Sequence, residues 1–166
     1  MLSYIKRLLA VGSLALLAAC GGGDDDRNVV QQLQADPRFS TLVTAVVAAD
    51  LVTTLSGPGP FMVFAPTNDA FAKIPTADLN ALLADKTALT NVLLYHVVPG
   101  KVTSNLVPAD GTTPIDTALT GQTFTVNSSL QITSSSSGTS RITQVDVPAT
   151  NGVIHVIDTV ILPGTP

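Results

Sequence analysis

The residues that could do chemistry are few and widely spaced. The chain has 166 residues, with one cysteine, two histidines and twelve acidic residues that are all aspartate. A serine hydrolase usually raises its nucleophile on a G-x-S-x-G turn, and no serine here has glycine at both of those positions. Zinc sites need His, Cys or acidic ligands at short spacings, whereas His96 and His155 lie far apart. We therefore expect no enzyme, no metal site and no cofactor.

Each histidine and several aspartates also have structural explanations. His96 and His155 lie among apolar residues, where a buried histidine with satisfied hydrogen bonds is an ordinary core residue. Paired carboxylates for glycoside cleavage are not excluded by spacing alone. However, residues 24–26 lie in a run of glycine and aspartate, and Asp36 stands before Pro37 as a helix N-cap.

Composition excludes further classes of protein. The formal net charge is −4 and the chain has no basic run, so we expect no nucleic-acid partner. A single cysteine excludes an internal disulfide and a cysteine-based metal knuckle. An apolar fraction of 45% with clear periodicity predicts a folded domain and not a disordered chain.

Residues 1–19 have the pattern of a secretory signal peptide. Lys6 and Arg7 precede the apolar stretch from Leu8 to Leu17, and small residues follow it. Such a stretch forms a helix of about 15 Å, which is too short for the roughly 30 Å hydrocarbon core of a bilayer. We therefore expect this segment to be cleaved, so that the mature protein is exported.

The segment Leu17-Ala18-Ala19-Cys20 resembles the lipobox of bacterial lipoproteins. The resemblance implies cleavage before Cys20, a lipid on its sulfur, and attachment to a membrane through acyl chains. Residues 20–27 would then be the lipidated cysteine and a flexible Gly/Asp tether. Because Gly21 replaces the aspartate that favours inner-membrane retention in that family, the outer membrane or cell surface is favoured. The alternative is an ordinary signal peptide with an incidental cysteine.

We expect one domain over residues 28–163, followed by a short tail at residues 164–166. Up to about Pro99 the apolar residues follow a helical period. The pattern predicts a first helix over Asn28–Ala35 and a strand from Phe61 to Ala65. A second helix should begin at Asp36-Pro37 and carry on one face Phe39, Leu42, Val43, Val46 and Val47. A third should begin at a capping Thr76, and a fourth at about Lys86, with one face formed by Leu89, Val92, Leu93 and His96.

Beyond Pro99 the apolar residues alternate with polar ones. This pattern predicts strands near Thr123–Val126 and Leu130–Thr133. The polar run from Ser134 to Ser140 reads as a hairpin tip, and Val153–Ile157 as a strand covered on both faces.

Three segments in a fixed order resemble the signatures of the fasciclin-like domain family. Residues 61–71 read FMVFAPTNDAF, residues 95–100 read YHVVPG, and residues 151–163 read NGVIHVIDTVILP. The match spans about Asn28 to Pro163. It implies an α+β fold, the fasciclin-like fold, in which about seven strands form a wedge or sandwich and several helices, mostly from the N-terminal half, pack along one side.

The signature residues have physical reasons to build such a fold. Pro66 cannot donate to a strand ladder, and Thr67 or Asn68 can cap the short turn after it. Asn151-Gly152 suits a tight turn with positive φ before the last strand. The residues that we assign to the fold by their place in the signatures are Phe64, Pro66, Thr67, Phe71, Gly152 and His155.

The resemblance also implies a non-enzymatic module for cell–cell or cell–matrix adhesion. In animal relatives adhesion is linked to a Tyr-His motif and to an Asp-Ile pair, which correspond to Tyr95, His96, Asp146 and Val147. Val147 departs from the family's isoleucine. A core position for His96 and a solvated strand-end charge for Asp146 are the structural alternatives.

We therefore expect an envelope lipoprotein whose partners are the membrane, through Cys20, and a protein or glycan at the cell surface. The alternative is an envelope-displayed module that binds a small molecule or a polysaccharide, for which the many Ser and Thr residues could supply hydroxyl groups. A deep pocket with converging polar groups would favour this alternative, and a flat exposed patch would favour adhesion.

Overall fold

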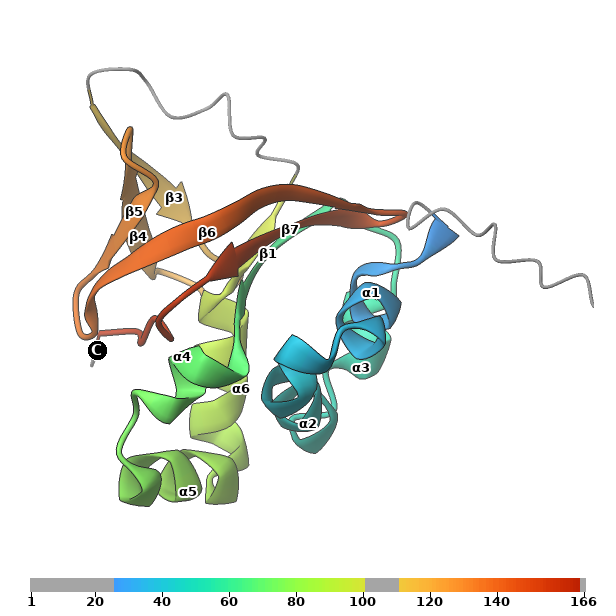
Figure 1. Cartoon of the computed structure of the whole chain (residues 1–166), viewed down its shortest axis with the longest axis horizontal. Helices are drawn as coiled ribbons and strands as arrows, with labels where there is room; N and C mark the ends of the chain where they lie inside the picture. The colour runs from blue at the N-terminus through green and yellow to red at the C-terminus, as the bar shows by residue number, and fades with distance from the viewer. Residues whose placement is uncertain (1–25, 101–110, 165–166) are drawn as a thin grey trace, which may run out of the picture.

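The computed structural model describes residues 26–100 and 111–164. The expected signal peptide, Cys20, most of the expected tether and the end of the tail lie outside the described residues. The helices are α1 (Val29–Ala35), the 3₁₀ helix η2 (Pro37–Phe39), α2 (Ser40–Ala48), α3 (Val52–Leu55), α4 (Asn68–Ala72), α5 (Thr76–Ala84) and α6 (Lys86–Tyr95). They lie together on one side of the sheet, as predicted (Figure 1).

Seven strands form one mixed sheet. They are β1 (Phe61–Pro66), β2 (Val97–Pro99), β3 (Thr112–Asp116), β4 (Thr123–Asn127), β5 (Gln131–Ser134), β6 (Gly138–Ala149) and β7 (Gly152–Ile157). Their order is β2-β1-β7-β6-β5-β4-β3, with β1 and β7 parallel. The sheet curls until its two edges approach, and the N–H of Ala118 donates to Val97 O at 2.7 Å. The α+β class and the number of strands are confirmed.

The sheet separates two hydrophobic cores because side chains alternate along each strand. On β1, Val63 and Ala65 pack against the helices, while Met62 and Phe64 fill the inside of the curled sheet. Phe64 meets Phe124 edge to face, with ring centroids 5.0 Å apart. Each large apolar side chain buried in this way stabilises the fold by about 1.5–3 kcal/mol.

The helix predicted from Asp36-Pro37 has a different course. Asp36 is an N-cap, as expected, but it caps the 3₁₀ helix η2, and α2 begins only at Ser40. Phe39 is nevertheless buried in the same helical core as Leu42 and Val46 of α2. Val47, which we expected on the buried face, is 53% exposed.

Two other local expectations are wrong. Thr76 is the first residue of α5 and makes no side-chain cap, because Pro75 occupies the N-cap position. Asp146 lies inside β6 and not at a strand end. It sits in an irregular stretch where the β6–β7 register shifts twice, and its φ of 54° is left-handed.

The turn before β7 also differs from expectation. Gly152 is not among the positive-φ glycines of the described chain, so the prediction of a positive-φ turn residue is wrong. Its small size is needed instead, because a Cβ at this position would lie 2.0 Å from the carbonyl oxygen of Phe61. Gly152 is therefore required by the close approach of β1 and β7.

The side chain of Asn151 joins this turn to the helical layer. Its Oδ1 accepts a hydrogen bond from the N–H of Val29 at 2.8 Å. Its Nδ2 donates to the carbonyls of Leu55 at 2.8 Å and Gly57 at 2.9 Å. One amide thus satisfies three backbone groups at the start of α1 and the end of α3.

Replacing Asn151 with alanine should destabilise the domain by about 2–4 kcal/mol, because three partly buried backbone groups would lose their hydrogen-bond partner. Chemical denaturation of the wild type and the variant measures this. Asn91→Ala, on the exposed face of α6, is the matched control and should change stability by no more than about 0.5 kcal/mol. Equal effects of the two substitutions would contradict the assigned role of Asn151.

Candidate functional site

Tyr95, the first residue of the Tyr-His motif, is a core residue. It is 0% exposed, and its hydroxyl donates to the carbonyl of Thr123 at 2.9 Å. Its ring meets Phe124 edge to face at 5.7 Å. Burial raises the pKa of the Tyr95 hydroxyl above its ordinary value. The side chain therefore ties the end of α6 to β4.

His96 caps the end of α6 and is 2% exposed. Its Nε2 accepts a hydrogen bond from the N–H of Ile161 at 3.2 Å. The proton must therefore be on Nδ1, which donates to the carbonyl of Val92 at 2.7 Å. Burial lowers the pKa of His96 to about 4, against the opposing effect of the bond to Val92. The imidazole is thus a neutral link between α6 and the segment after β7.

His155 holds the irregular part of β6 in place. It is 4% exposed, and its Nδ1 accepts a hydrogen bond from the N–H of Asp146 at 3.1 Å. Its Nε2 lies 4.0 Å from Asp146 Oδ1, and its ring packs against Phe64 at 5.5 Å. The backbone of Asp146 therefore has a specific partner on the neighbouring strand.

The remaining signature residues sit where β1 leads into α4. Thr67 caps α4, because its Oγ1 accepts a hydrogen bond from the N–H of Ala70 at 3.3 Å. Asn68, the other expected cap, instead donates to the carbonyl of Pro37 at 3.0 Å and links α4 to η2. Pro66 ends β1 opposite Ile157, and Phe71 is buried in the helical core.

Asp146 and Val147 line a cleft of about 400 Å³ between α1 and η2 on one side and β6 on the other. The Asp146 side chain is 40% exposed, whereas Val147 is partly buried against the helical core. The other residues that line this cleft, which we call the Asp146 cleft, are Gln32, Leu33, Asp36, Arg38, Phe39, Gln144, Val145, Pro148, Ile154 and Val156.

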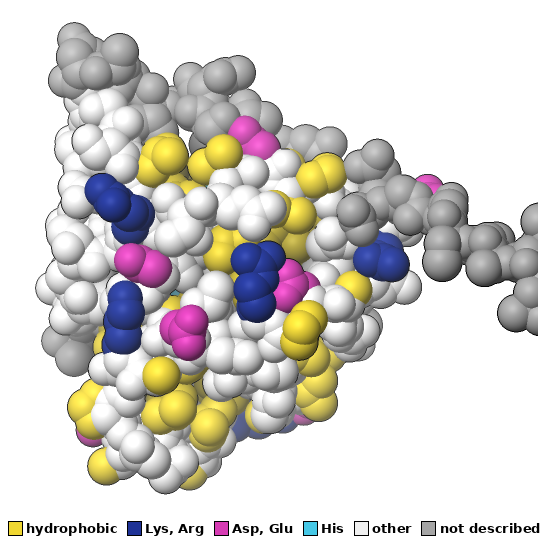
Figure 2. Space-filling model, viewed as in Figure 1, with side chains coloured by type: hydrophobic (Ala, Val, Ile, Leu, Met, Phe, Trp, Pro, Cys, Tyr) yellow, Lys and Arg dark blue, Asp and Glu magenta, His cyan; other side chains and the backbone are white. Residues whose placement is uncertain are grey.

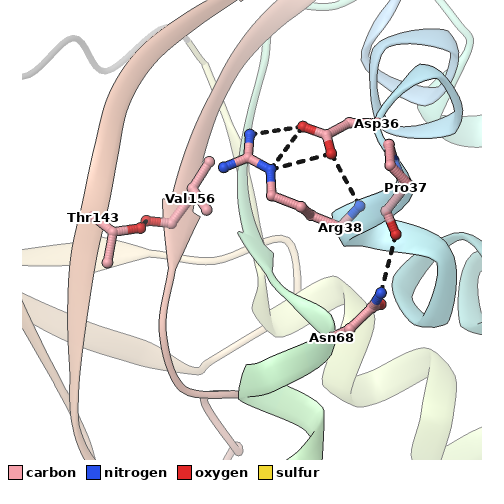
Figure 3. A network of polar contacts seen from close by, with 6 residues as sticks. All are labelled: Asp36, Pro37, Arg38, Asn68, Thr143 and Val156. Atoms are coloured by element: carbon pink, nitrogen blue, oxygen red, sulfur yellow. Dashed lines mark hydrogen bonds and ion pairs between the residues drawn. The ribbon is translucent and has the colours of Figure 1, made fainter.

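An ion pair forms the helical rim of the Asp146 cleft. Figure 2 shows basic and acidic side chains in close groups on this face. Arg38 Nε lies 3.1 and 3.0 Å from the two carboxylate oxygens of Asp36, and Arg38 Nη2 lies 2.6 Å from Oδ2. Figure 3 shows the guanidinium turned from η2 toward Val156 on β7. The hydrogen bonds from Arg38 lower the pKa of Asp36.

The ion pair shapes the rim more than it stabilises the fold. The side chains of Arg38 and Asp36 are 56% and 28% exposed, and pairs of this kind contribute at most about 1 kcal/mol. Because the guanidinium also lies 5.5 Å from the centroid of the Phe39 ring, it stays beside the cleft as a fixed, largely neutralised group. The cleft therefore presents an apolar floor with a polar rim.

The four candidate adhesion residues do not form one surface. Tyr95 and His96 are buried with satisfied polar atoms, and only the Asp146–Val147 pair lines an open cleft. The sequence alone did not indicate Asp36, Arg38 and Gln144 as cleft residues, because the walls of the Asp146 cleft come from segments more than a hundred positions apart. Their individual patterns carry no signal of that pairing.

Within residues 26–100 and 111–164, no three His, Cys or Asp side chains gather as metal ligands. No helix in these ranges has both the length and the apolar character needed to cross a membrane.

The described residues thus form a curled mixed sheet with helices along one side and two core histidines. Residues 37–163 match the family model of the fasciclin domain, and the chain belongs to that family. The family is generally one of adhesion-type modules and not of enzymes. A solved pair of FAS1 domains from the insect cell adhesion molecule fasciclin I has the same fold, with a TM-score of 0.59 and 19% identity over 75% of this chain and 45% of that one.

Relatives occur in bacteria and animals. The Synechocystis protein sll1483 is 44% identical over 142 residues, which are 84% of this chain and 76% of the relative. Human periostin is 35% identical over 140 residues, 83% of this chain but 16% of periostin. The Mycobacterium bovis cell surface glycolipoprotein MPB83 is 33% identical over 136 residues, 77% of this chain and 57% of that protein.

The buried His96 should make stability depend on pH. Its pKa is about 4 in the folded state and about 6.5 in an unfolded chain, so the unfolded state binds more protons between these values. The free energy of unfolding should therefore be highest above pH 6.5 and fall toward pH 4, by at most about 3 kcal/mol from this group.

The measurement is chemical denaturation of the wild type and His96→Gln at several pH values from 7 to 4. The gap between the two unfolding free energies should narrow as the pH falls, because the variant has no imidazole at this position. In NMR, one histidine should titrate near pH 4. A constant gap, together with a titration of His96 near pH 6.5, would show that the buried imidazole is not kept neutral.

Proposed function

We propose that the protein is a lipid-anchored module of a bacterial cell envelope that mediates adhesion or contact with a surface or matrix. The observation that carries the proposal is the fasciclin domain over residues 37–163 behind an N-terminal segment that resembles a signal peptide and lipobox. Two comparisons support it: the relative named as a cell surface glycolipoprotein and the fold shared with a cell adhesion molecule. The outer membrane or cell surface is the proposed location.

We further propose that the Asp146 cleft is the contact region. Of the four candidate residues, Asp146 alone has a largely accessible side chain. Its backbone N–H is held by the hydrogen bond to His155, and the floor of the cleft consists of the buried side chains of Leu33 and Ile154. A preformed cleft of this kind reduces the entropy that is lost on binding.

The anchor is tested by replacing Cys20 with serine in the natural host. The variant should move from the membrane fraction to the soluble exported fraction, because it lacks the sulfur that would carry the lipid. Its thermal denaturation should match that of the wild type, since the domain begins after the tether. A variant that still sediments with membranes at high salt would exclude the lipid anchor.

The contact region is tested with a deletion strain that is complemented by variants. Asp146→Asn removes the charge but suits the left-handed φ of 54°, because asparagine tolerates this conformation. Cell aggregation or surface attachment should fall at least about fivefold with Asp146→Asn, a loss of the size expected for a contact residue. The control Asp78→Asn, at an exposed position of α5, should behave like the wild type.

Thermal denaturation of both variants guards against a folding defect. Attachment that is normal in the deletion strain itself would count against the adhesive function, whereas normal attachment with Asp146→Asn alone would count only against the cleft.

A further inference from the structure

Arg141, at the start of β6, differs from the other basic residues of the described chain. Arg38 pairs with Asp36, Lys86 with Asp50, and Lys73 lies 3.8 Å from a carboxylate oxygen of Asp158. Arg27 has a partner as well. Across residues 26–100 and 111–164, the guanidinium of Arg141 is the basic group for which no hydrogen bond or ion pair occurs.

Arg141 lines a polar groove of about 330 Å³ where the end of α4, the start of β6 and the segment after β7 meet. We call it the Arg141 groove; it is also lined by Lys73, Gln131, Thr139, Ser140, Asp158 and Thr159. It shares no lining residue with the Asp146 cleft. On the face shown in Figure 2, basic and acidic side chains stand close together at the sheet side of the molecule.

Several hydrogen-bond acceptors of the Arg141 groove already have protein donors, and Asp158 Oδ2 has the ammonium of Lys73 at 3.8 Å. Asp158 Oδ1 accepts from the N–H of Arg141 at 2.9 Å and from the hydroxyl of Thr159 at 3.0 Å. Thr159 Oγ1 in turn accepts from Lys73 Nζ at 3.1 Å. Gln131 Oε1 accepts from the amide of Asn127 at 3.1 Å.

The charge of Asp158 is stabilised by the same contacts. Its burial alone would raise the pKa of the carboxyl group, but the bonds from Arg141 and Thr159 and the nearby charge of Lys73 outweigh that effect and lower it. Asp158 is therefore ionised at neutral pH, and its contacts are with the backbone N–H of Arg141, Thr159 and Lys73 and not with the guanidinium of Arg141.

The groups left over in this groove are donors. They are the guanidinium of Arg141, the amide N–H groups of Gln131, the hydroxyl of Thr139 and the two remaining ammonium hydrogens of Lys73. Two positive charges stand against one negative charge, on a chain whose formal net charge is −4. A guanidinium binds a carboxylate through two parallel hydrogen bonds, so the groove is complementary to an oxyanion.

We propose that the Arg141 groove binds the carboxylate groups of an acidic polysaccharide. Its lining is polar on all sides, and the hydroxyl of Thr139 can exchange hydrogen bonds with a sugar hydroxyl next to the carboxylate. A phospholipid headgroup or an acidic peptide offers the same oxyanion, but its neighbouring acyl chains or side chains would find no apolar wall among the residues that line the groove. This binding goes beyond the proposed adhesive role of the Asp146 cleft and does not depend on it.

The test is titration of the full-length protein, purified in detergent from its host's membranes, with polygalacturonate and with neutral dextran. Polygalacturonate should bind, dextran should not, and affinity should fall as NaCl is raised from about 50 to 500 mM, because salt screens exposed charges. Arg141→Gln should weaken binding about tenfold and Arg141→Lys by less, since lysine keeps the charge but loses the planar fork. Lys86→Gln removes a paired cation elsewhere and should have no effect.

Several results would overturn the proposal. These are equal binding by Arg141→Gln and the wild type, equal binding of dextran and polygalacturonate, or no binding of polygalacturonate by the wild type. Binding to anionic phospholipid vesicles or to poly-aspartate that requires Arg141, without binding to polygalacturonate, would assign the groove to lipid or peptide instead. Since Arg141 is exposed, all variants should fold, and thermal denaturation checks this.

Discussion

The amide side chain of Asn151 is the constraint on which most of this structure depends. It occupies the turn between β6 and β7 and satisfies backbone groups at the start of α1 and the end of α3. Because a buried backbone group without a partner is costly, the helical layer has one favoured position relative to the sheet. The same residue accepts the N–H of Phe61 on its carbonyl at 3.0 Å, so the register of β1 against β7 begins at this point.

The Asp146 cleft follows from that arrangement. One wall of the cleft consists of α1 and η2, whose distance from the sheet is set at Asn151. The other wall is the irregular part of β6, which is held by His155 on the neighbouring strand β7. The Tyr-His motif performs the corresponding task at the other core. Tyr95 fastens α6 to β4, and His96 fastens it to the segment around Ile161. Each of the three signature segments thus contains residues that connect a helix to the sheet, and this structural role restricts which residue types can stand there.

Local features were predictable because neighbouring residues determine them. The apolar run at β1, the alternation at β4, the buried strand β7 and the Thr67 cap were all read correctly from short patterns. The strands β2 and β3, the full length of β6 and the parallel pairing of β1 with β7 were not, since distant segments decide them. Asn151 shows the difference most clearly: its place before a glycine suggested only a turn, while its three side-chain bonds depend on where two helices end. The walls of the Asp146 cleft were hidden for the same reason.

The pairing of β1 with β7 joins the first strand of the chain to the last. Phe61 faces Gly152, about 90 positions later, and contacts so distant in sequence are slow to form because a long loop must close first. A chain that emerges from its N-terminus cannot complete β1 until β7 is available, so its two cores must close together, late and after synthesis of almost the whole domain. The order of the strands thus makes the last segment of the domain a condition for the folding of the first.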